Sequence, residues 1–539
     1  MSPTFTIEKY SHGFKIINRD PRLCPIFNRL VTKNCMSEWT KDHQGRPVLT
    51  PKQYFGFSSG STDYRFHLGQ LPFLMQLLQY NCITPDQYNI VDKSIPEGDD
   101  VKIKFDWEKY KLRKFQPDAL QFILSNSEDD IRTRMVTVYT GGGKSVIAAA
   151  ATDKIGKRVL MPILPKYVGK WVADVQEYTD TKPKEIAVIN GLDTVAGLIQ
   201  MGKDGELGKI KFIIISLATL HLFYKEYYQC PVAFRERFGI EPEDLCSVLG
   251  IGLILIDEGH EHIHRIYQVL SHSNVNKVIT LSATMTSADR NVLEVQEFMF
   301  PLNKRFLGDG MEKYITCTGV SYRFHNFINA NVKWKAWGSN LYSHTAFEKC
   351  IIHNKAFLRD YLDMILYYVK MHYHDKYQKG DRGMVFAATS DMCTHIVNHL
   401  KKHLPQYDIR RFTPSIGDPY ENMTESDIRV TTSISGGTGH DIKKLTTVIQ
   451  TITVIAPVQN HQAYGRLRVM DGRELNFVYL FCEQIPKQVE GHQLKKKLYR
   501  PKAASIVDSS YPINIGSNHP PKQSNFGKRV AEGKVFKAW

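Results

Sequence analysis

The chain has 539 residues, 42% of them hydrophobic, and a formal net charge of +15 at pH 7. No run approaches the roughly 18 to 20 apolar residues of a membrane span, and the first residues lack a secretion signal, so we expect a cytoplasmic protein. The nine cysteines include no Cys-x-x-Cys pair, so we expect neither a zinc ribbon nor a disulfide framework. The positive charge indicates a polyanion such as nucleic acid as partner, or else an ordinary basic surface.

The chain length suits about three or four domains. Residues 1–105 are predicted to form a small α+β accessory domain with mixed strands and one clear helix over 71–80. Its charges nearly balance, so composition does not identify it as DNA-binding, and that role stays open. The acidic, turn-rich stretch at 94–100 marks the approach to its boundary.

Residues 106–310 alternate apolar strands with helical stretches, the pattern of a parallel α/β sheet. The strand candidates are short, nearly unbroken apolar runs, which suit central strands buried on both faces. They lie at 135–138, 158–161, 211–215, 252–256 and 278–281. The longer connection at 222–249 is expected to elaborate this sheet.

A second alternating series over 311–490 predicts a second α/β domain. Its expected strands lie at 384–387, 429–432, 447–449 and 476–481, with helices at 356–371 and 392–404. Residues 491–539 are basic and then rich in Pro, Asn, Ser and Gly, which predicts a partly flexible tail that either touches phosphates or is simply solvated.

The stretch 138–145 (VYTGGGKS) joins a strand to a helix, which is the context of a nucleotide P-loop. Its three glycines allow the backbone amides to face one anion, and the helix N-terminus adds the positive end of its dipole. In such a loop Lys144 reaches the β and γ phosphates and Ser145 holds Mg²⁺. A plain glycine-rich turn is the alternative, because Val138 stands where the full motif has glycine.

Asp257 and Glu258 follow the strand at 252–256, at the sheet edge where parallel α/β proteins place ligand chemistry. Hydrolysis of a nucleoside triphosphate needs one carboxylate on Mg²⁺ and another group that orients the attacking water, roles that suit Asp257 and Glu258 in that order. A solvated acidic turn is the alternative. Ser282 and Thr284 end the next strand, and their hydroxyls are expected to hydrogen-bond the acidic pair, although a simple Ser/Thr turn also explains them.

Two arginines in the second α/β domain, Arg466 and Arg468, lie within 462–468 (QAYGRLR). Phosphoryl transfer leaves charge on the γ-phosphate, which an arginine from another domain can stabilise. Arg466 is the first candidate and Arg468 the second. A surface arginine pair at a helix start is the alternative.

Taken in order, these stretches resemble the motif set of the superfamily 2 helicases and translocases over about residues 110–485. The matching segments are 112–116 (glutamine motif), 140–145 (motif I), 162–171 (Ia), 216–220 (a further strand-contacting motif), 257–260 (DEAH-type motif II), 282–284 (III), 386–389 (IV), 439–442 (V) and 462–468 (VI). The resemblance implies two tandem RecA-like domains with ATP and Mg²⁺ bound between them.

The resemblance also assigns roles residue by residue. The implied catalytic residues are Lys144, Glu258, Arg466 and Arg468. The implied nucleotide contacts are Gln116 (which reads adenine), Thr140, Gly141, Gly142, Gly143, Lys144, Ser145, Asp257, Gly439, Asp441 and Gln462, with Ser145 and Asp257 also on Mg²⁺. Ser282 and Thr284 are the residues implied to couple the nucleotide state to the motor. The implied nucleic-acid contacts are Pro162, Lys166, Ser216, Thr219 and Thr389.

Three positions depart from the family pattern. Val138 replaces a small residue, and Gly259 replaces the alanine or cysteine of motif II. Val469 stands where the family commonly has its second motif VI arginine, so that Arg468 is one residue short. This last departure leaves open whether Arg466 or Arg468 is the main arginine that stabilises the γ-phosphate.

Within the superfamily, the chain is most similar to the phage UvsW-type branch-migration helicases, with the XPB and RecG group behind them. Outside the motor core, this similarity rests on the helix start at 71–73 (LPF) in a small N-terminal domain. The resemblance implies branched, forked or single-stranded DNA as partner, and the host cytoplasm as location if the protein is phage-encoded. The alternatives are an RNA helicase, a duplex translocase that does not separate strands, and a non-hydrolysing nucleic-acid scaffold.

Overall fold

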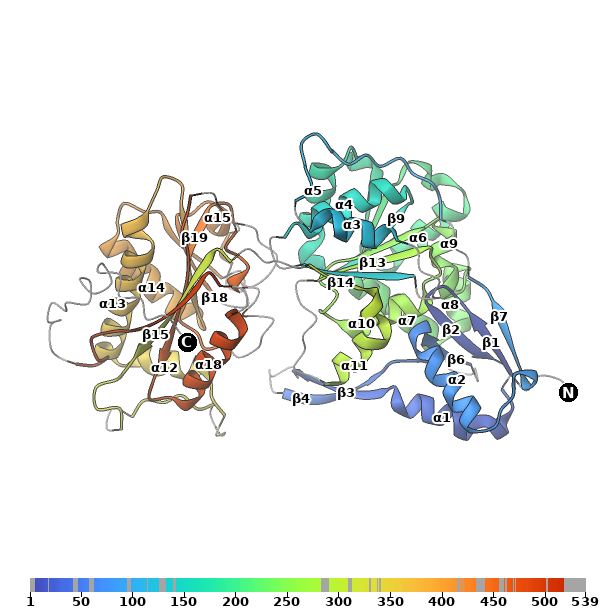
Figure 1. Cartoon of the computed structure of the whole chain (residues 1–539), viewed down its shortest axis with the longest axis horizontal. Coiled ribbons are helices and arrows are strands. Elements are labelled where there is room, and N and C mark those ends of the chain that lie inside the picture. The colour runs from blue at the N-terminus through green and yellow to red at the C-terminus, as the bar shows by residue number, and fades with distance from the viewer. Residues whose placement is uncertain are drawn as a thin grey trace. The chain divides into compact units, whose positions relative to one another are not determined.

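The computed structural model describes residues 5–17, 19–41, 47–57, 63–94, 98–113, 115–125, 132–138, 142–282, 290–308, 313–328, 331–336, 338, 341–413, 417–419, 421–432, 442–454, 460, 463–468, 470, 472–500 and 503–517. The chain divides into two compact units, Met1–Gly310 and Met311–Trp539, drawn in Figure 1. None of the described helices is long and apolar enough to cross a membrane.

The first unit begins with a small α+β domain, as predicted. Its mixed sheet has the strand order β5-β6-β2-β1-β7, and α1 and α2 contribute Phe27, Leu30, Leu74 and Leu78 to the core on this sheet. The elements are β1 (Phe5–Lys9), β2 (Gly13–Ile17), α1 (Cys24–Lys33), β5 (Gly56–Phe57), β6 (Tyr64–His67), α2 (Leu71–Tyr80) and β7 (Tyr88–Asp92). A separate antiparallel hairpin, β3 (Cys35–Lys41) with β4 (Pro47–Gln53), is named the β3–β4 arm here.

The first α/β domain contains an all-parallel sheet of seven strands in the order β10-β11-β9-β12-β13-β8-β14. Its strands are β8 (Thr133–Thr137), β9 (Val159–Ile163), β10 (Ile186–Ile189), β11 (Phe212–Ser216), β12 (Leu253–Ile256), β13 (Lys277–Ser282) and β14 (Arg305–Leu307). Its helices are α3 (Gln116–Leu124), α4 (Lys144–Ile155), α5 (Val168–Tyr178), α6 (Leu192–Lys203), α7 (Leu217–Gln229), α8 (Pro231–Phe238), α9 (Leu245–Val248), α10 (Ile263–His272) and α11 (Arg290–Met299).

The unbroken apolar runs of these strands arise because both faces of the sheet are covered. In β11, Ile213 and Ile215 belong to the core beneath α6, α7 and α10, whereas Phe212 and Ile214 belong to the core with α3, α4 and α5. Figure 1 shows α3, α4 and α5 on one side of the sheet and α7 and α10 on the other. A strand with this double burial has no polar face, as expected for a parallel sheet.

The boundary predicted after residue 105 lies earlier in the structure. Ile103 and Phe105 are buried in the core of the first α/β domain, and backbone hydrogen bonds join Val101 to Gly156 and Asp106 to Tyr178. The small domain therefore ends after β7, and the stretch that follows packs along the first α/β domain.

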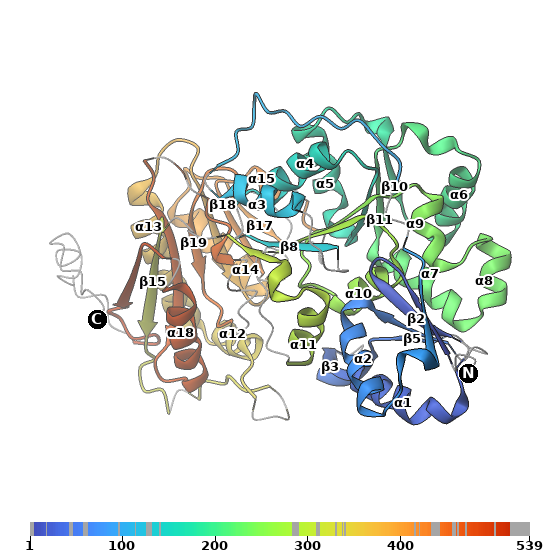
Figure 2. The ribbon, with the colours of Figure 1, turned by 45° about the vertical axis from the view of Figure 1, so that its right-hand side comes forward.

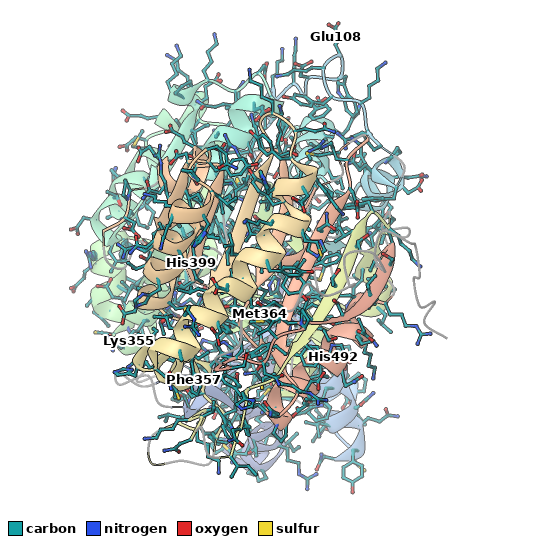
Figure 3. All side chains as sticks on the ribbon, turned by 90° about the vertical axis from the view of Figure 1, so that its left-hand side faces the viewer. Glu108, Lys355, Phe357, Met364, His399 and His492 are labelled. Carbon is teal, nitrogen blue, oxygen red and sulfur yellow. The ribbon has the colours of Figure 1, made fainter. Side chains whose placement is uncertain are left out.

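The second unit is another all-parallel seven-stranded sheet, ordered β17-β18-β16-β19-β20-β15-β21. Its strands are β15 (Ile315–Tyr322), β16 (Arg382–Ala387), β17 (Ile409–Phe412), β18 (Ile428–Thr432), β19 (Leu445–Gln450), β20 (Leu475–Cys482) and β21 (Ser505–Ser510). Its helices are α12 (His344–His353), α13 (Lys355–His372), α14 (Ser390–His403), α15 (Glu421–Thr424) and α18 (Pro486–Tyr499). Figure 3 shows α13, with Phe357 and Met364 labelled, lying over this sheet.

Part of the predicted tail belongs to the second sheet. α18 continues to Tyr499, whose ring is fully buried and stacks on Tyr464 with centroids 4.8 Å apart. β21 then pairs in parallel with β15 from Ser505 to Ser510. The domain therefore continues past residue 490, and the tail proper, from residue 518, lies outside the described residues.

The small domain docks closely on α10, α11 and the connection before β12. Ser11 Oγ accepts a hydrogen bond from Val275 N at 2.7 Å, and the His67 backbone N–H donates to Tyr267 Oη at 3.1 Å. A Cβ at Gly13 would collide with the Ser271 carbonyl oxygen, so a side chain there would push the two domains apart. The buried polar groups at this interface make the small domain a fixed part of the first unit.

Three histidines at this interface, His12, His67 and His272, are almost completely buried, and burial lowers the pKa of each to about 3. The unfolded chain takes up protons near pH 6.5 and the folded chain does not, so stability falls as pH drops below about 6.5. We expect the free energy of unfolding of the first unit to be lower at pH 5 than at pH 7.5 by about 1–2 kcal/mol per histidine. Urea unfolding at both pH values measures this difference. His12→Asn should flatten the pH dependence, and an unchanged slope in that variant would contradict the assignment.

Candidate active site

The glycine loop follows β8 and leads into α4, as predicted. Gly143 has φ +82°, and α4 begins at the next residue, Lys144. Only glycine adopts this left-handed backbone without strain, so the last glycine of the loop is needed for the turn itself. Val138, which departs from the motif, is buried in the core, and its N–H donates to the Ser282 carbonyl at 3.0 Å. Its burial explains why an apolar residue stands at this position.

The acidic pair meets the P-loop lysine at the carboxyl end of β12. Lys144 Nζ lies 2.6 Å from Glu258 Oε1 and 3.7 Å from Asp257 Oδ1. Burial alone would raise the pKa of Asp257, but the charges of Lys144 and Lys170 and a hydrogen bond from Trp171 hold this pKa below its usual value. Asp257 is therefore ionised at neutral pH, as a magnesium ligand must be.

The backbone around the acidic pair is tightly constrained. Glu258 has φ +50°, a left-handed conformation that costs energy for a residue with a side chain and that occurs often at functional sites. Gly259 donates its N–H to the Leu281 carbonyl at 2.9 Å, and a Cβ at this position would collide with the buried Thr280 methyl group. Packing against β13 therefore explains why glycine replaces the usual alanine or cysteine.

Gln116, the predicted adenine reader, contacts the P-loop directly. Its Nε2 donates to the Gly142 carbonyl at 2.8 Å, and its Oε1 accepts from the Arg113 backbone N–H at 2.8 Å. The side chain is buried. Gln116 thus ties the start of α3 to the loop, and its adenine-reading role stays a prediction.

Two residues of α5 that the sequence analysis did not single out belong to this site. Trp171 Nε1 donates to Asp257 Oδ2 at 2.8 Å, and Lys170 Nζ donates to Ser145 Oγ at 3.3 Å. They orient the two residues that are predicted to hold Mg²⁺. A tryptophan after two basic residues within 162–171 was a usable signal, but its partner lies 86 positions away.

A histidine links Ser282 to the acidic pair. His260 Nδ1 lies 2.9 Å from Ser282 Oγ and 3.4 Å from Glu258 Oε2. Burial lowers the pKa of His260, partly offset by the nearby Glu258 charge, so the ring is neutral at pH 7. The link from Glu258 to the end of β13 therefore passes through His260.

Three of the predicted nucleic-acid contacts are buried in this structure. Pro162 lies inside β9, and Ser216 and Thr219 are nearly inaccessible, with the Ser216 hydroxyl accepting the Thr219 N–H at 3.1 Å to cap α7. These side chains pack inside the first unit, and their contact with nucleic acid stays a prediction. Lys166, on the short turn η4 (Pro165–Tyr167), is exposed, and its contact with nucleic acid also stays a prediction.

Thr389, at the carboxyl end of β16, is held by a buried carboxylate that the sequence analysis missed. Glu348 on α12 is 0% exposed and accepts hydrogen bonds from Ala388 N, Thr389 N and Thr389 Oγ1 at 2.7, 2.8 and 2.8 Å. Burial raises the pKa of Glu348 to about 7 despite these hydrogen bonds.

Glu348→Ala would leave two backbone N–H groups and a hydroxyl without an acceptor, and it should lower the free energy of unfolding of the second unit by about 2–3 kcal/mol. A carboxyl whose pKa is raised on folding contributes stability below pH 4.5 that is lost as pH rises through 7. The loss in the variant should therefore be larger at pH 5 than at pH 8, as urea unfolding would measure. The exposed Glu490→Ala is the control, and equal losses in both variants would contradict the assignment.

The predicted arginines of the second unit differ in exposure. Arg466 is 7% exposed and its N–H bonds to the Ala463 carbonyl at 3.4 Å, whereas Arg468 is half-buried. The predicted residues that fall outside the described part of the chain are Thr140, Gly141, Thr284, Gly439, Asp441 and Gln462.

Residues 109–287 match the protein family described as "Type III restriction enzyme, res subunit". This segment contains the glycine loop, the acidic pair and Ser282. The two all-parallel seven-stranded sheets have the arrangement expected of tandem RecA-like domains. The match supports the resemblance to superfamily 2 at the level of a helicase-like ATPase, and the UvsW-type branch stays a proposal. No curated protein matches the chain in sequence.

Among solved structures, the chain is similar to the Pyrococcus furiosus Hef helicase domain, with 14% identity and a TM-score of 0.45 over 72% of this chain and 99% of that one. It is also similar to T4 UvsW, with 12% identity and a TM-score of 0.32 over 95% and 99%. A third is S. cerevisiae Dbp5 bound to RNA and ADP BeF3, with 13% identity and a TM-score of 0.45 over 73% and 89%. At these identities the likeness is one of fold alone.

Proposed function

We propose that the protein is an ATP-dependent nucleic-acid motor, and specifically a DNA helicase or translocase that acts on forked or junction DNA. One observation carries the ATPase assignment: the Nζ of Lys144 lies within 3.7 Å of both Asp257 and Glu258 at the carboxyl end of a parallel sheet. A phosphate-binding lysine, a metal-binding carboxylate and a water-orienting carboxylate are the parts that phosphoryl transfer needs in one place.

The described residues fit Mg²⁺ and ATP. Mg²⁺ prefers hard oxygen ligands and uses one or two carboxylates together with phosphate oxygens, and an ionised Asp257 with the Ser145 hydroxyl provides that set. When bound, the ion neutralises developing charge on the phosphates. Lys144 binds the phosphates in place of its contact with Glu258, and Glu258 is then free to orient the attacking water.

The second RecA-like domain completes the proposed site. Arg466, with Arg468 as alternative, supplies positive charge to the transferring phosphoryl group, and Gln462, Gly439 and Asp441 contact the nucleotide. Domain closure then depends on ATP, and hydrolysis relaxes it, which moves the two domains along one strand. The basic net charge of +15 supports a polyanionic track.

The preference for branched DNA rests on the UvsW-type resemblance of the small domain. ATPase stimulation by forked DNA, duplex DNA and RNA at one salt concentration tests it, since phosphate binding is very sensitive to salt. Stimulation by forked DNA, with unwinding of labelled forks or four-way junctions, is the expected result. Stimulation by RNA alone would indicate an RNA helicase. ATP turnover on duplex DNA without strand separation would indicate a translocase, and nucleic-acid binding without ATP hydrolysis would indicate a scaffold.

A further inference from the structure

A lysine of α5 contacts the hydroxyl group that is predicted to hold Mg²⁺. Lys170 Nζ donates a hydrogen bond to Ser145 Oγ at 3.3 Å. The contact is possible because α5 packs beside α4, whose first turn contains Ser145, and the two helices lie side by side in both Figure 1 and Figure 2. An ammonium group from outside the P-loop therefore faces the oxygen atom that we expect to bind the metal ion.

The same ammonium group has a carboxylate partner on its own helix. Lys170 Nζ lies 3.0 Å from Asp174 Oδ2, one helical turn further along α5. Ser145 and Asp174 also line the same small cavity. The structure has both contacts at once, so the ammonium group can leave Ser145 and keep its pairing with Asp174.

The second predicted metal ligand, Asp257, is also held by groups of the protein. Its Oδ2 accepts the Trp171 Nε1–H at 2.8 Å, and its Oδ1 accepts the Glu258 backbone N–H at 2.9 Å. Lys144 Nζ lies 3.7 Å from Oδ1. Burial would raise the pKa of Asp257, but the charges of Lys144 and Lys170 act in the opposite direction and hold it below its usual value. Two ammonium groups therefore balance the charge of the two predicted metal ligands.

Ammonium groups and a divalent cation repel each other strongly at such distances. Both lysines must therefore move away from these oxygen atoms before the oxygen atoms can accept a metal ion. Each lysine has its own anionic destination. The phosphates of the nucleotide attract Lys144, whereas Asp174 is the partner within reach of Lys170.

We propose that Lys170 is a counter-ion that competes with the metal ion for Ser145 and pairs with Asp174 alone when the metal ion is bound. The inference rests on the proposed function and deepens it, because it specifies how metal binding at that site is regulated. Without nucleotide, both ammonium groups stay on the metal ligands and keep the affinity for free divalent cations low. The phosphates of ATP draw Lys144 away and offset the charge of Lys170, so the metal ligands become available together with the nucleotide.

Lys170→Met tests the inference, because methionine keeps an unbranched apolar side chain and removes the charge. Binding of Mn²⁺ alone to the nucleotide-free protein, measured by electron paramagnetic resonance of the free ion, gives the dissociation constant. We expect this constant to fall about 10-fold in Lys170→Met, since one positive charge beside the divalent cation is lost. Asp174→Asn should raise it about 2- to 5-fold, because Lys170 then lacks its alternative partner.

The matched control is Lys184→Met, which removes one charge from an exposed position of the same unit and should bind Mn²⁺ like the wild type. Asp257→Asn added to Lys170→Met should abolish the gain in affinity, which assigns the bound ion to this site. The unfolding midpoint of each variant identifies any loss of folding.

Equal dissociation constants in the wild type and Lys170→Met, or no binding by either, would overturn the inference. Weaker binding by Lys170→Met would also overturn it, because Lys170 would then orient Ser145 for the metal ion instead of competing with it. The measurement needs neither nucleotide nor turnover, so it decides the inference even if the proposed ATPase activity fails. A chain whose Mn²⁺ affinity responds as expected but that never hydrolyses ATP would contradict only the proposed function.

Discussion

Glu258→Gln is expected to lower kcat for ATP hydrolysis by at least about 100-fold, because a water-orienting general base typically contributes a factor of 10² to 10⁴. Glutamine retains the size of the side chain but cannot accept a proton. The ion pair with Lys144, 2.6 Å in length, would also be lost, so the lysine would become more available to phosphate. ATP binding should therefore persist or strengthen while turnover fails.

Steady-state ATPase rates with and without saturating DNA, together with nucleotide binding by calorimetry, measure these two effects separately. Lys144→Ala should weaken ATP binding and abolish turnover. Glu261→Gln is the matched control, because Glu261 follows within the same turn and contacts Lys166 and Tyr167 instead of Lys144. Unchanged turnover in purified Glu258→Gln would rule out the proposed mechanism.

Glu243→Ala is expected to destabilise the first unit by about 3–5 kcal/mol, the usual cost of removing one partner from a buried ion pair. Glu243 is 7% exposed, and its Oε1 lies 2.8 Å from Arg65 Nη2 and 2.5 Å from Lys15 Nζ. Burial alone would raise the pKa of Glu243, but Arg65 and Lys15 lower it to about 2. The carboxylate is charged at neutral pH, and its removal leaves two cations of the small domain uncompensated.

Urea unfolding at pH 7, and the rate at which trypsin releases the small domain, measure this loss. Glu241→Ala is the matched control, because Glu241 pairs with the exposed Arg235 and such surface pairs contribute about 0–1 kcal/mol. Because the pKa of Glu243 is lowered on folding, its contribution should disappear as pH falls from about 4.5 toward 2. If Glu243→Ala lost no more stability than Glu241→Ala, the buried cluster would not be what holds the small domain in place.

Much of the fold was predictable because its signals are local. Unbroken apolar runs such as 211–215 and 252–256 became central strands, since both of their faces are covered by helices. The predicted strands did not include the edge strands β10, β14, β17 and β21, nor the inner strand β15, whose sequence ITCTGVSY has no unbroken apolar run. Edge strands are shorter or only partly buried, so their apolar pattern is weaker, as the half-exposed β10 illustrates.

The nucleotide-site residues were predictable for a different reason: motif chemistry is written in consecutive residues. Gly143, Lys144, Asp257 and Glu258 could be assigned without knowing the strand order. Burial could not be predicted in this way: Pro162, Ser216 and Thr219, which were expected to contact nucleic acid, are buried in the structure. A hydroxyl that caps a helix looks the same in sequence as one that contacts a phosphate.

The sequence by itself determined the local conformations and the chemical groups available for phosphoryl transfer, because each depends on residues a few positions apart. Only the tertiary structure decided which distant groups meet. Trp171 reaches Asp257 because β9 and β12 are neighbours in the sheet, Glu348 reaches Thr389 because α12 packs near the end of β16, and His264 reaches the Gln53 carbonyl because the arm docks on α10. These pairings follow from strand order and domain docking, which arise from the sum of many weak contacts and leave no mark at any one position of the chain.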